Sequence, residues 1–123
     1  MVNKMSSGDG LESSEAARKK KIRELNDRLR QTGEGGQMVA TQGILALDAS
    51  IQIDLANKIK TFNEFTSDND PYKEHDFGMV EVAGLRCFWK IDYYDKTMAM
   101  HSPDKSDPEV TNRVMTIMLA DEY

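Results

Sequence analysis

Ligand-type side chains are concentrated in the middle of the chain: Glu74, His75 and Asp76 are consecutive, and Asp92, Asp95 and His101 follow. Hydrolytic metal sites use three such ligands with an open position, and acid catalysis needs a positioned carboxylate with a raised pKa. The two histidines are too far apart in the sequence for a recognised zinc signature. We therefore predict that these carboxylates tether a loop, with Asp76 accepting backbone N–H groups at the loop's exit. A small metal-assisted hydrolase that uses residues 74–76 is the alternative.

Other catalytic motifs are missing from the sequence. Residues 33–36 (Gly-Glu-Gly-Gly) follow a predicted helix and lack the Gly-Lys-Ser/Thr ending that cradles phosphates. Residues 68–70 resemble the start of a calcium loop, but Lys73 and Met79 occupy the positions that require Gly and Glu. Cys87 lies on a predicted core face, where a thiol is a small hydrophobic group. The sequence thus assigns no catalytic residue, metal or cofactor, and we expect a protein that is not an enzyme.

Two segments hold the candidates for partner binding. The outward side of the predicted strand 85–94 combines aromatic and charged groups, as binding surfaces with hot spots do. Cross-strand pairing under a covering helix explains the same residues, and we favour that structural interpretation. The binding candidates are Phe88, Lys90, Asp92 and Tyr94 on this strand and Asp70, Tyr72, Glu74, His75 and Asp76 in the preceding loop.

A basic cluster lies near the N-terminus and comprises Arg18, Lys19, Lys20, Lys21 and Arg23. Such a cluster can bind phosphates, but no groove-fitting motif accompanies it. We therefore predict a solvated helix face and, at most, weak electrostatic binding of nucleic acid. A nucleic-acid-binding protein that uses the helix 18–30 is a second alternative.

The elements that position these residues follow from periodicity and capping signals. Helical spacing of apolar residues predicts a helix from Ser13 or Ser14 to about Gln31 and a second helix that begins at Asp48. The Asp107-Pro108-Glu109 start signal predicts a last helix with a wide apolar arc. Strands are predicted at 37–41, 77–82, 85–94 and 97–101, and residues 66–76 form a long loop.

These elements predict an α+β fold: a small antiparallel sheet of three to four strands, with a central meander, covered by about three helices. The domain is expected to span residues 13–123 and to follow a disordered polar tail, residues 1–12. Trp89 and Ile91 should be buried with Leu55, Ile59, Val114 and Ile117.

The charge is unevenly distributed, because residues 1–33 have a net charge of +3 and residues 34–123 have a net charge of −8. An acidic body repels nucleic acid and favours a protein partner with a basic surface. The apolar runs are too short to cross a bilayer, no secretory signal is visible, and the single cysteine is consistent with the cytoplasm. We therefore expect a cytoplasmic protein.

Residues 69–78 and 88–95 resemble a bacterial family catalogued as domain of unknown function 3768. Residues 22–27, 33–36 and 115–123 are similar to the same family, so the resemblance extends from about Ile22 to the end of the chain. The resemblance implies no activity, but it implies a setting near plasmid and other mobile-element genes. We therefore expect an interaction protein, as an accessory or counter-defence factor of a mobile genetic element, that acts through its acidic surface.

Overall fold

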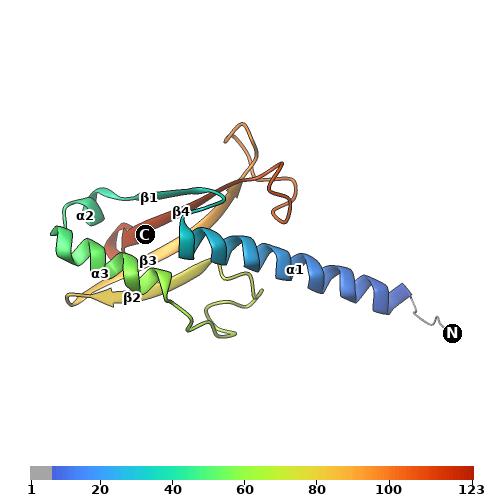
Figure 1. The fold of residues 1–123 in the computed structure, drawn as a ribbon, viewed down its shortest axis with the longest axis horizontal. Helices are drawn as coiled ribbons and strands as arrows, with labels where there is room; N and C mark the ends of the chain where they lie inside the picture. The colour runs from blue at the N-terminus through green and yellow to red at the C-terminus, as the bar shows by residue number, and fades with distance from the viewer. Residues whose placement is uncertain (1–6) are drawn as a thin grey trace.

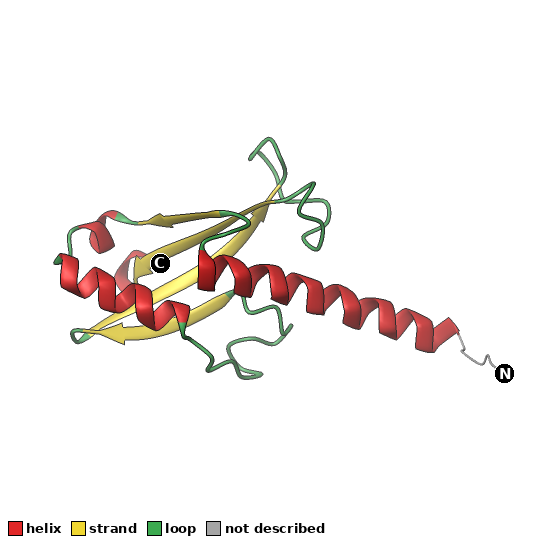
Figure 2. Ribbon diagram, in the orientation of Figure 1, coloured by secondary structure: helices red, strands yellow, loops and turns green. Residues whose placement is uncertain are grey.

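The computed structural model describes residues 7–123, and its central element is a four-stranded sheet with the order β1-β4-β3-β2 (Figure 1). The strands are β1 (Gln37–Ala40), β2 (Phe77–Val82), β3 (Leu85–Tyr94) and β4 (Asn112–Leu119). The helices are α1 (Ser7–Thr32), α2 (Gln42–Leu45), α3 (Ala49–Lys60) and the short 3-10 helix η1 (Ala120–Glu122). The predicted α+β class is confirmed. Figure 2 shows α1, α2 and α3 on the same side of the sheet.

The sheet is mixed. Strands β2, β3 and β4 are antiparallel neighbours, and Ala83 and Gly84 form the tight turn between β2 and β3 with φ values of 52° and 78°. Positive φ at both central residues is the conformation that matches the twist of a two-residue hairpin. Strand β1 instead runs parallel to β4, with Gln37 beside Val114 and Ala40 beside Ile117. The predicted sheet was wholly antiparallel, so this edge differs from the prediction.

The predicted last helix is wrong, because residues 112–119 form β4. Met115, Ile117 and Leu119 point to the helix-covered face, and Val114 and Met118 are buried on the other face. A strand with apolar residues on both faces has no clean alternation, so it resembles a buried helix in sequence. The Asp107 side chain accepts the backbone N–H of Glu109, as a helix cap would, but a turn follows.

The predicted strand 97–101 is also wrong. Asp95 accepts hydrogen bonds from the backbone N–H groups of Thr97 and Ala99, which folds this segment into a turn. The segment forms one isolated bridge to β3, between His101 and Tyr94.

The hydrophobic core lies between the sheet and the helices. Trp89 and Ile91 are buried with Leu55 and Ile59, as predicted, and Ile117 packs at the margin of this cluster. Val114 is buried as well, but on the opposite face of β4. The core is completed by residues from every layer: Leu29, Ile44, Phe62, Val82, Cys87 and Met115.

Helix α1 begins at Ser7, earlier than the capping pattern predicted, and extends beyond the sheet (Figure 1). Residues 14–21 are exposed, whereas Ile22, Asn26, Leu29 and Arg30 are buried against the body. The first six residues of the predicted disordered tail lie outside the described residues. Every helix between residues 7 and 123 is too short or too polar to cross a bilayer.

Candidate functional site

The loop between α3 and β2 is held in place by its own carboxylate, Asp70. Asp70 is 5% exposed, and its Oδ1 accepts the backbone N–H groups of Glu74 at 3.0 Å and His75 at 3.1 Å. These bonds hold the backbone of Lys73 and His75 in the left-handed region, with φ values of 59° and 58°. Residues other than glycine seldom adopt this conformation. The tether function predicted for the loop is therefore present, but the prediction that Asp76 performs it is wrong.

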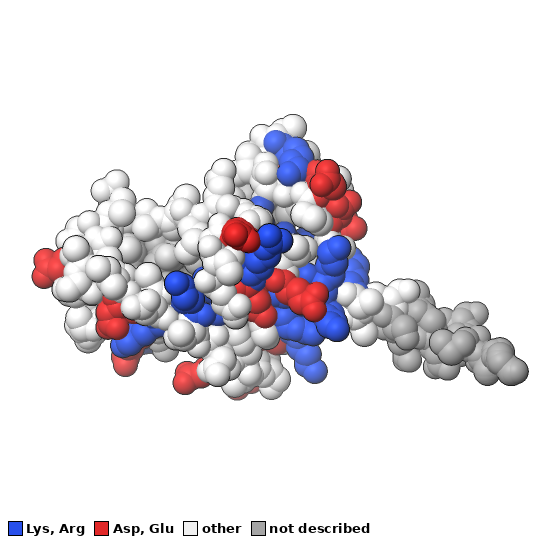
Figure 3. Space-filling model, viewed as in Figure 1, with Lys and Arg blue, Asp and Glu red and all other residues white. Residues whose placement is uncertain are grey.

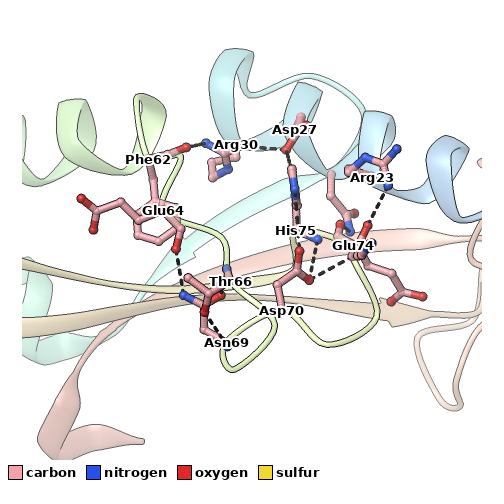
Figure 4. Close-up of polar contacts among 12 residues, drawn as sticks. Arg23, Asp27, Arg30, Phe62, Glu64, Thr66, Asn69, Asp70, Glu74 and His75 are labelled. Carbon is pink, nitrogen blue, oxygen red and sulfur yellow. Dashed lines mark hydrogen bonds and ion pairs between the residues drawn. The ribbon is translucent and has the colours of Figure 1, made fainter.

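Several side chains of helix α1 bind this loop, and Figure 4 shows Arg23, Asp27 and Arg30 directed toward it. Asp27 Oδ1 lies 2.9 Å from His75 Nδ1, and Asn26 Nδ2 donates to the Glu74 carbonyl at 2.9 Å. Arg30 pairs with Asp27 at 2.8 Å. We call the resulting set the anchor network: Asn26, Asp27 and Arg30 of α1 with Asp70, Glu74 and His75 of the loop.

Arg30 extends the anchor network to the end of α3. Its guanidinium is buried and donates to the carbonyl oxygens of Ile59 and Phe62, each at 3.1 Å. The last carbonyls of a helix have no partner within the helix, so a buried arginine there satisfies groups that would otherwise be unpaired. Phe65 and His75 stack with ring centroids 3.7 Å apart. The loop is therefore fixed against both helices.

A second cluster of polar side chains lies beneath the loop, around Tyr93 of β3. The Tyr93 hydroxyl accepts a hydrogen bond from Asn26 Nδ2 at 2.7 Å and donates to Asp76 Oδ2 at 3.3 Å. Lys105 binds Glu74 Oε1 at 2.8 Å and lies over the Tyr93 ring. Burial, and then the negative charges of Glu74 and Asp70, raise the pKa of Asp76 above its usual range. The ionised form of Asp76 is thus destabilised by its surroundings.

This raised pKa predicts how Asp76→Asn changes the dependence of stability on pH. A carboxyl group that binds its proton more tightly in the folded chain destabilises the fold above the usual pKa of about 3.9. The wild type therefore loses stability as the pH rises from about 3.9 through the raised value. Asp76→Asn should be more stable than the wild type at neutral pH, and the difference should vanish in acid. Thermal melts at a series of pH values measure it, and a less stable variant at neutral pH would contradict the prediction.

The other ligand-type residues do not join the loop carboxylates. Asp92 pairs with Lys90 at 2.9 Å, Asp95 accepts a hydrogen bond from the Thr97 hydroxyl at 2.7 Å, and His101 is exposed. Among residues 7–123, no group of three or more His, Cys, Asp or Glu side chains is arranged to hold a metal ion. His75 and Asp70 contact each other at 3.7 Å within the anchor network. The charged side chains of the loop therefore contact mainly the backbone and side chains of the protein itself.

The second group of candidates lies on the sheet face opposite the helices, which we call the open face. Phe88, Lys90, Asp92 and Tyr94 share this face, as predicted from the alternation of β3. The helix that was expected to cover this face is not formed, because residues 112–119 are strand β4 and pair edge to edge with β3. Cross-strand pairing places further residues on the open face: Val39, Phe77, Met79, Glu81, Arg86, Val114, Thr116 and Met118.

Aromatic rings cluster at one end of the open face. The Phe88 ring lies 5.2 Å from Phe77 and 5.4 Å from Tyr123, centroid to centroid. Val39 is 43% exposed, Met79 42% and Tyr123 74%, so apolar surface reaches the solvent. The Lys90–Asp92 pair lies between the aromatic cluster and Tyr94. Tyr72, the remaining loop candidate, is exposed and is separate from the loop's inward contacts.

Sequence reasoning missed Asn26 and Arg30 of the anchor network, and Tyr93 and Arg113 beneath the loop. Arg113 is buried, donates to Asn26 Oδ1 at 2.7 Å and lies over the Tyr93 ring. One signal was available for Asn26, because it follows Ile22 by four residues and precedes Leu29 by three. A polar residue at an apolar position of a helix face predicts a buried hydrogen bond. Arg113 gave no such signal, because its segment was predicted to be helical.

Comparison with known proteins gives one match. A family model described as "Protein of unknown function (DUF3768)" matches residues 40–122. The match includes α3, the loop and strands β2 to β4, and it begins after α1. Neither the curated proteins nor the solved structures contain a match to the chain.

Proposed function

We propose that this chain, which belongs to the DUF3768 family, is a non-enzymatic interaction protein that binds a protein partner on its open face. One observation carries the proposal: α1, α2 and α3 lie on one face of the sheet, and the other face presents exposed Met79 beside an aromatic cluster, with exposed Val39 on the edge strand β1. Removing such apolar surface from water is favourable, so an uncovered patch of this kind marks an interaction site.

The composition of the open face supports a protein as the partner. Aromatic residues and methionine are enriched at protein interfaces, and a tyrosine or phenylalanine in a well-packed setting is a common hot spot. Phe77 and Phe88 pack against each other and against Tyr123, so their positions are already fixed before binding. A preorganised surface loses less side-chain freedom when a partner docks.

The charge of the body supports a partner with a basic surface. Residues 34–123 carry 16 Asp and Glu against 8 Lys and Arg. This field attracts basic proteins and accelerates their association, and it opposes nucleic acid on this face. The setting that the family resemblance implies, a mobile genetic element in a bacterium, provides a place to search for such a partner.

The hydrolase alternative has weaker support. His75 and Asp70 are engaged with Asp27, with each other and with the loop backbone, so they offer few free positions to a metal or a substrate. A catalytic base needs a free ring nitrogen or carboxylate oxygen to accept a proton, and those of His75 and Asp70 already contact groups of the protein.

Site-specific photocrosslinking tests the proposal in the native host. A photo-reactive residue placed at Met79, on the open face, should give a discrete crosslinked product with a basic protein. The matched control is Ile53, which is 63% exposed on α3 and lies on the helical side. The partner identified in the crosslinked product is then purified on its own, and its affinity for the wild-type chain is measured by titration.

In that titration, Met79→Glu should weaken binding by roughly tenfold or more, and Ile53→Glu should leave it unchanged. Equal crosslinking from positions 79 and 53, or a purified partner whose affinity is insensitive to Met79→Glu, would overturn the proposal.

A further inference from the structure

The surface between α1 and the loop contains two adjoining hollows that form one groove. The first has a volume of about 440 Å³ and includes Lys19, and the second has a volume of about 400 Å³ and includes Thr66 and Ser67. Arg23, Pro71 and Lys73 line both hollows, so they join them. This groove lies on the helical side of the molecule and is separate from the open face.

Three cations line the groove. Lys19 and Arg23 are four residues apart on α1, which places them on one face of the helix about 6 Å apart along its axis. Arg23 donates to the Lys73 carbonyl at 3.0 Å, and this bond places the Lys73 backbone beside the helix. Neither Lys19 nor Lys73 forms an ion pair with another described residue. Figure 3 shows Lys and Arg side chains gathered around this part of the molecule.

The carboxylates nearby cancel these charges only in part. Asp70 lines the groove, but it accepts two backbone hydrogen bonds and contacts His75. Asp27 is paired with Arg30 and His75. Glu15 is the remaining carboxylate that lines the first hollow. The groove lining therefore carries three cations against the two carboxylates of Glu15 and Asp70, a net charge of +1, on a protein whose body is acidic.

We propose that this groove binds the phosphate backbone of single-stranded nucleic acid. Proteins that bind single strands without sequence preference use a positively charged groove that follows the backbone. Reading the bases of a duplex instead requires an element that enters a groove of the double helix, and the loop lies against the face of α1 that carries Lys19 and Arg23. Lys19, Arg23 and Lys73 contact the phosphates, and the acidic body keeps the affinity low.

Fluorescence anisotropy with a short labelled oligothymidylate tests the proposal. At low salt the wild-type protein should bind, and the logarithm of the association constant should fall with the logarithm of salt with a slope of about −2, for three phosphate contacts. Lys19→Ala and Lys73→Ala should each weaken binding several-fold and make the slope shallower by about 0.7. Lys96→Ala is the matched control, because it removes the same charge from an exposed residue of another loop.

Several results would overturn the inference. These are no binding at low salt, equal loss in Lys96→Ala and in the groove variants, or tighter binding of a duplex than of the single strand. The open-face variant Met79→Glu should bind the oligonucleotide as the wild type does. The experiments therefore distinguish a wrong assignment of the groove from a wrong assignment of the open face.

Discussion

Trp89→Ala should lower the free energy of unfolding by about 3–5 kcal/mol, a large part of the stability of a domain of this size. Trp89 is fully buried, and its ring contacts Phe62 and Phe65 edge to face, with centroids 5.6 and 6.1 Å away. The Arg30 guanidinium lies 5.3 Å from the same ring. Truncation therefore removes packing with α1 and with the segment that follows α3. Chemical denaturation followed by circular dichroism measures the loss.

Trp89→Phe is the matched control for this substitution. It keeps a ring in the core, and it removes an indole N–H that is buried without a hydrogen-bond partner. Its loss should be below about 1.5 kcal/mol. A loss below about 1 kcal/mol for Trp89→Ala would show that the core lies elsewhere.

Arg113→Met should also destabilise the protein, by about 2–4 kcal/mol, because it leaves two buried neutral acceptors without a donor, at about 1–3 kcal/mol each. Arg113 is 1% exposed, donates to Asn26 Oδ1 at 2.7 Å and to the Lys105 carbonyl, and lies over the Tyr93 ring. The variant would leave Asn26 and that carbonyl buried without their donor. Urea denaturation of the purified variant provides the measurement.

Two companions separate the network from a general effect of charge. Arg86→Met removes an exposed arginine from β3 and should change stability by no more than about 0.5 kcal/mol. Arg113→Lys keeps the positive charge but has a single ammonium group in place of the planar guanidinium that serves Asn26 and the Lys105 carbonyl, so it should retain most of the loss. If Arg113→Met is as stable as Arg86→Met, the interior network is not a source of stability.

The fold was predictable where a segment has one buried face. The alternation along β3 and the four-residue spacing of Leu55 and Ile59 identified the correct core, and Ala83-Gly84 identified the hairpin. The prediction failed at β4, because Val114 and Met118 on one face and Met115 on the other removed the alternation that marks a strand. Pairing with β3 on one side and β1 on the other decides the structure of this segment, and such pairing is not visible in a local window.

The candidate site was predictable as a loop but not in its details. The polar composition of residues 66–76 indicated a tethered loop, and the tether is present. Which carboxylate forms it depends on the left-handed turns at Lys73 and His75, which the sequence does not specify. The partner of His75 is Asp27, 48 residues earlier in the chain, so the pair could not be inferred from spacing.

The parallel pairing of β1 with β4 determines the order in which the chain can fold. Strands β2, β3 and β4 follow one another in the chain, whereas β1 must wait for a partner that is synthesised more than 70 residues later. The contact between Asn26 and Arg113 spans 87 residues and has the same requirement. Strand β1 therefore has no partner strand on a ribosome-bound chain until β4 has emerged, whereas α1 can contact α3 and the loop before then.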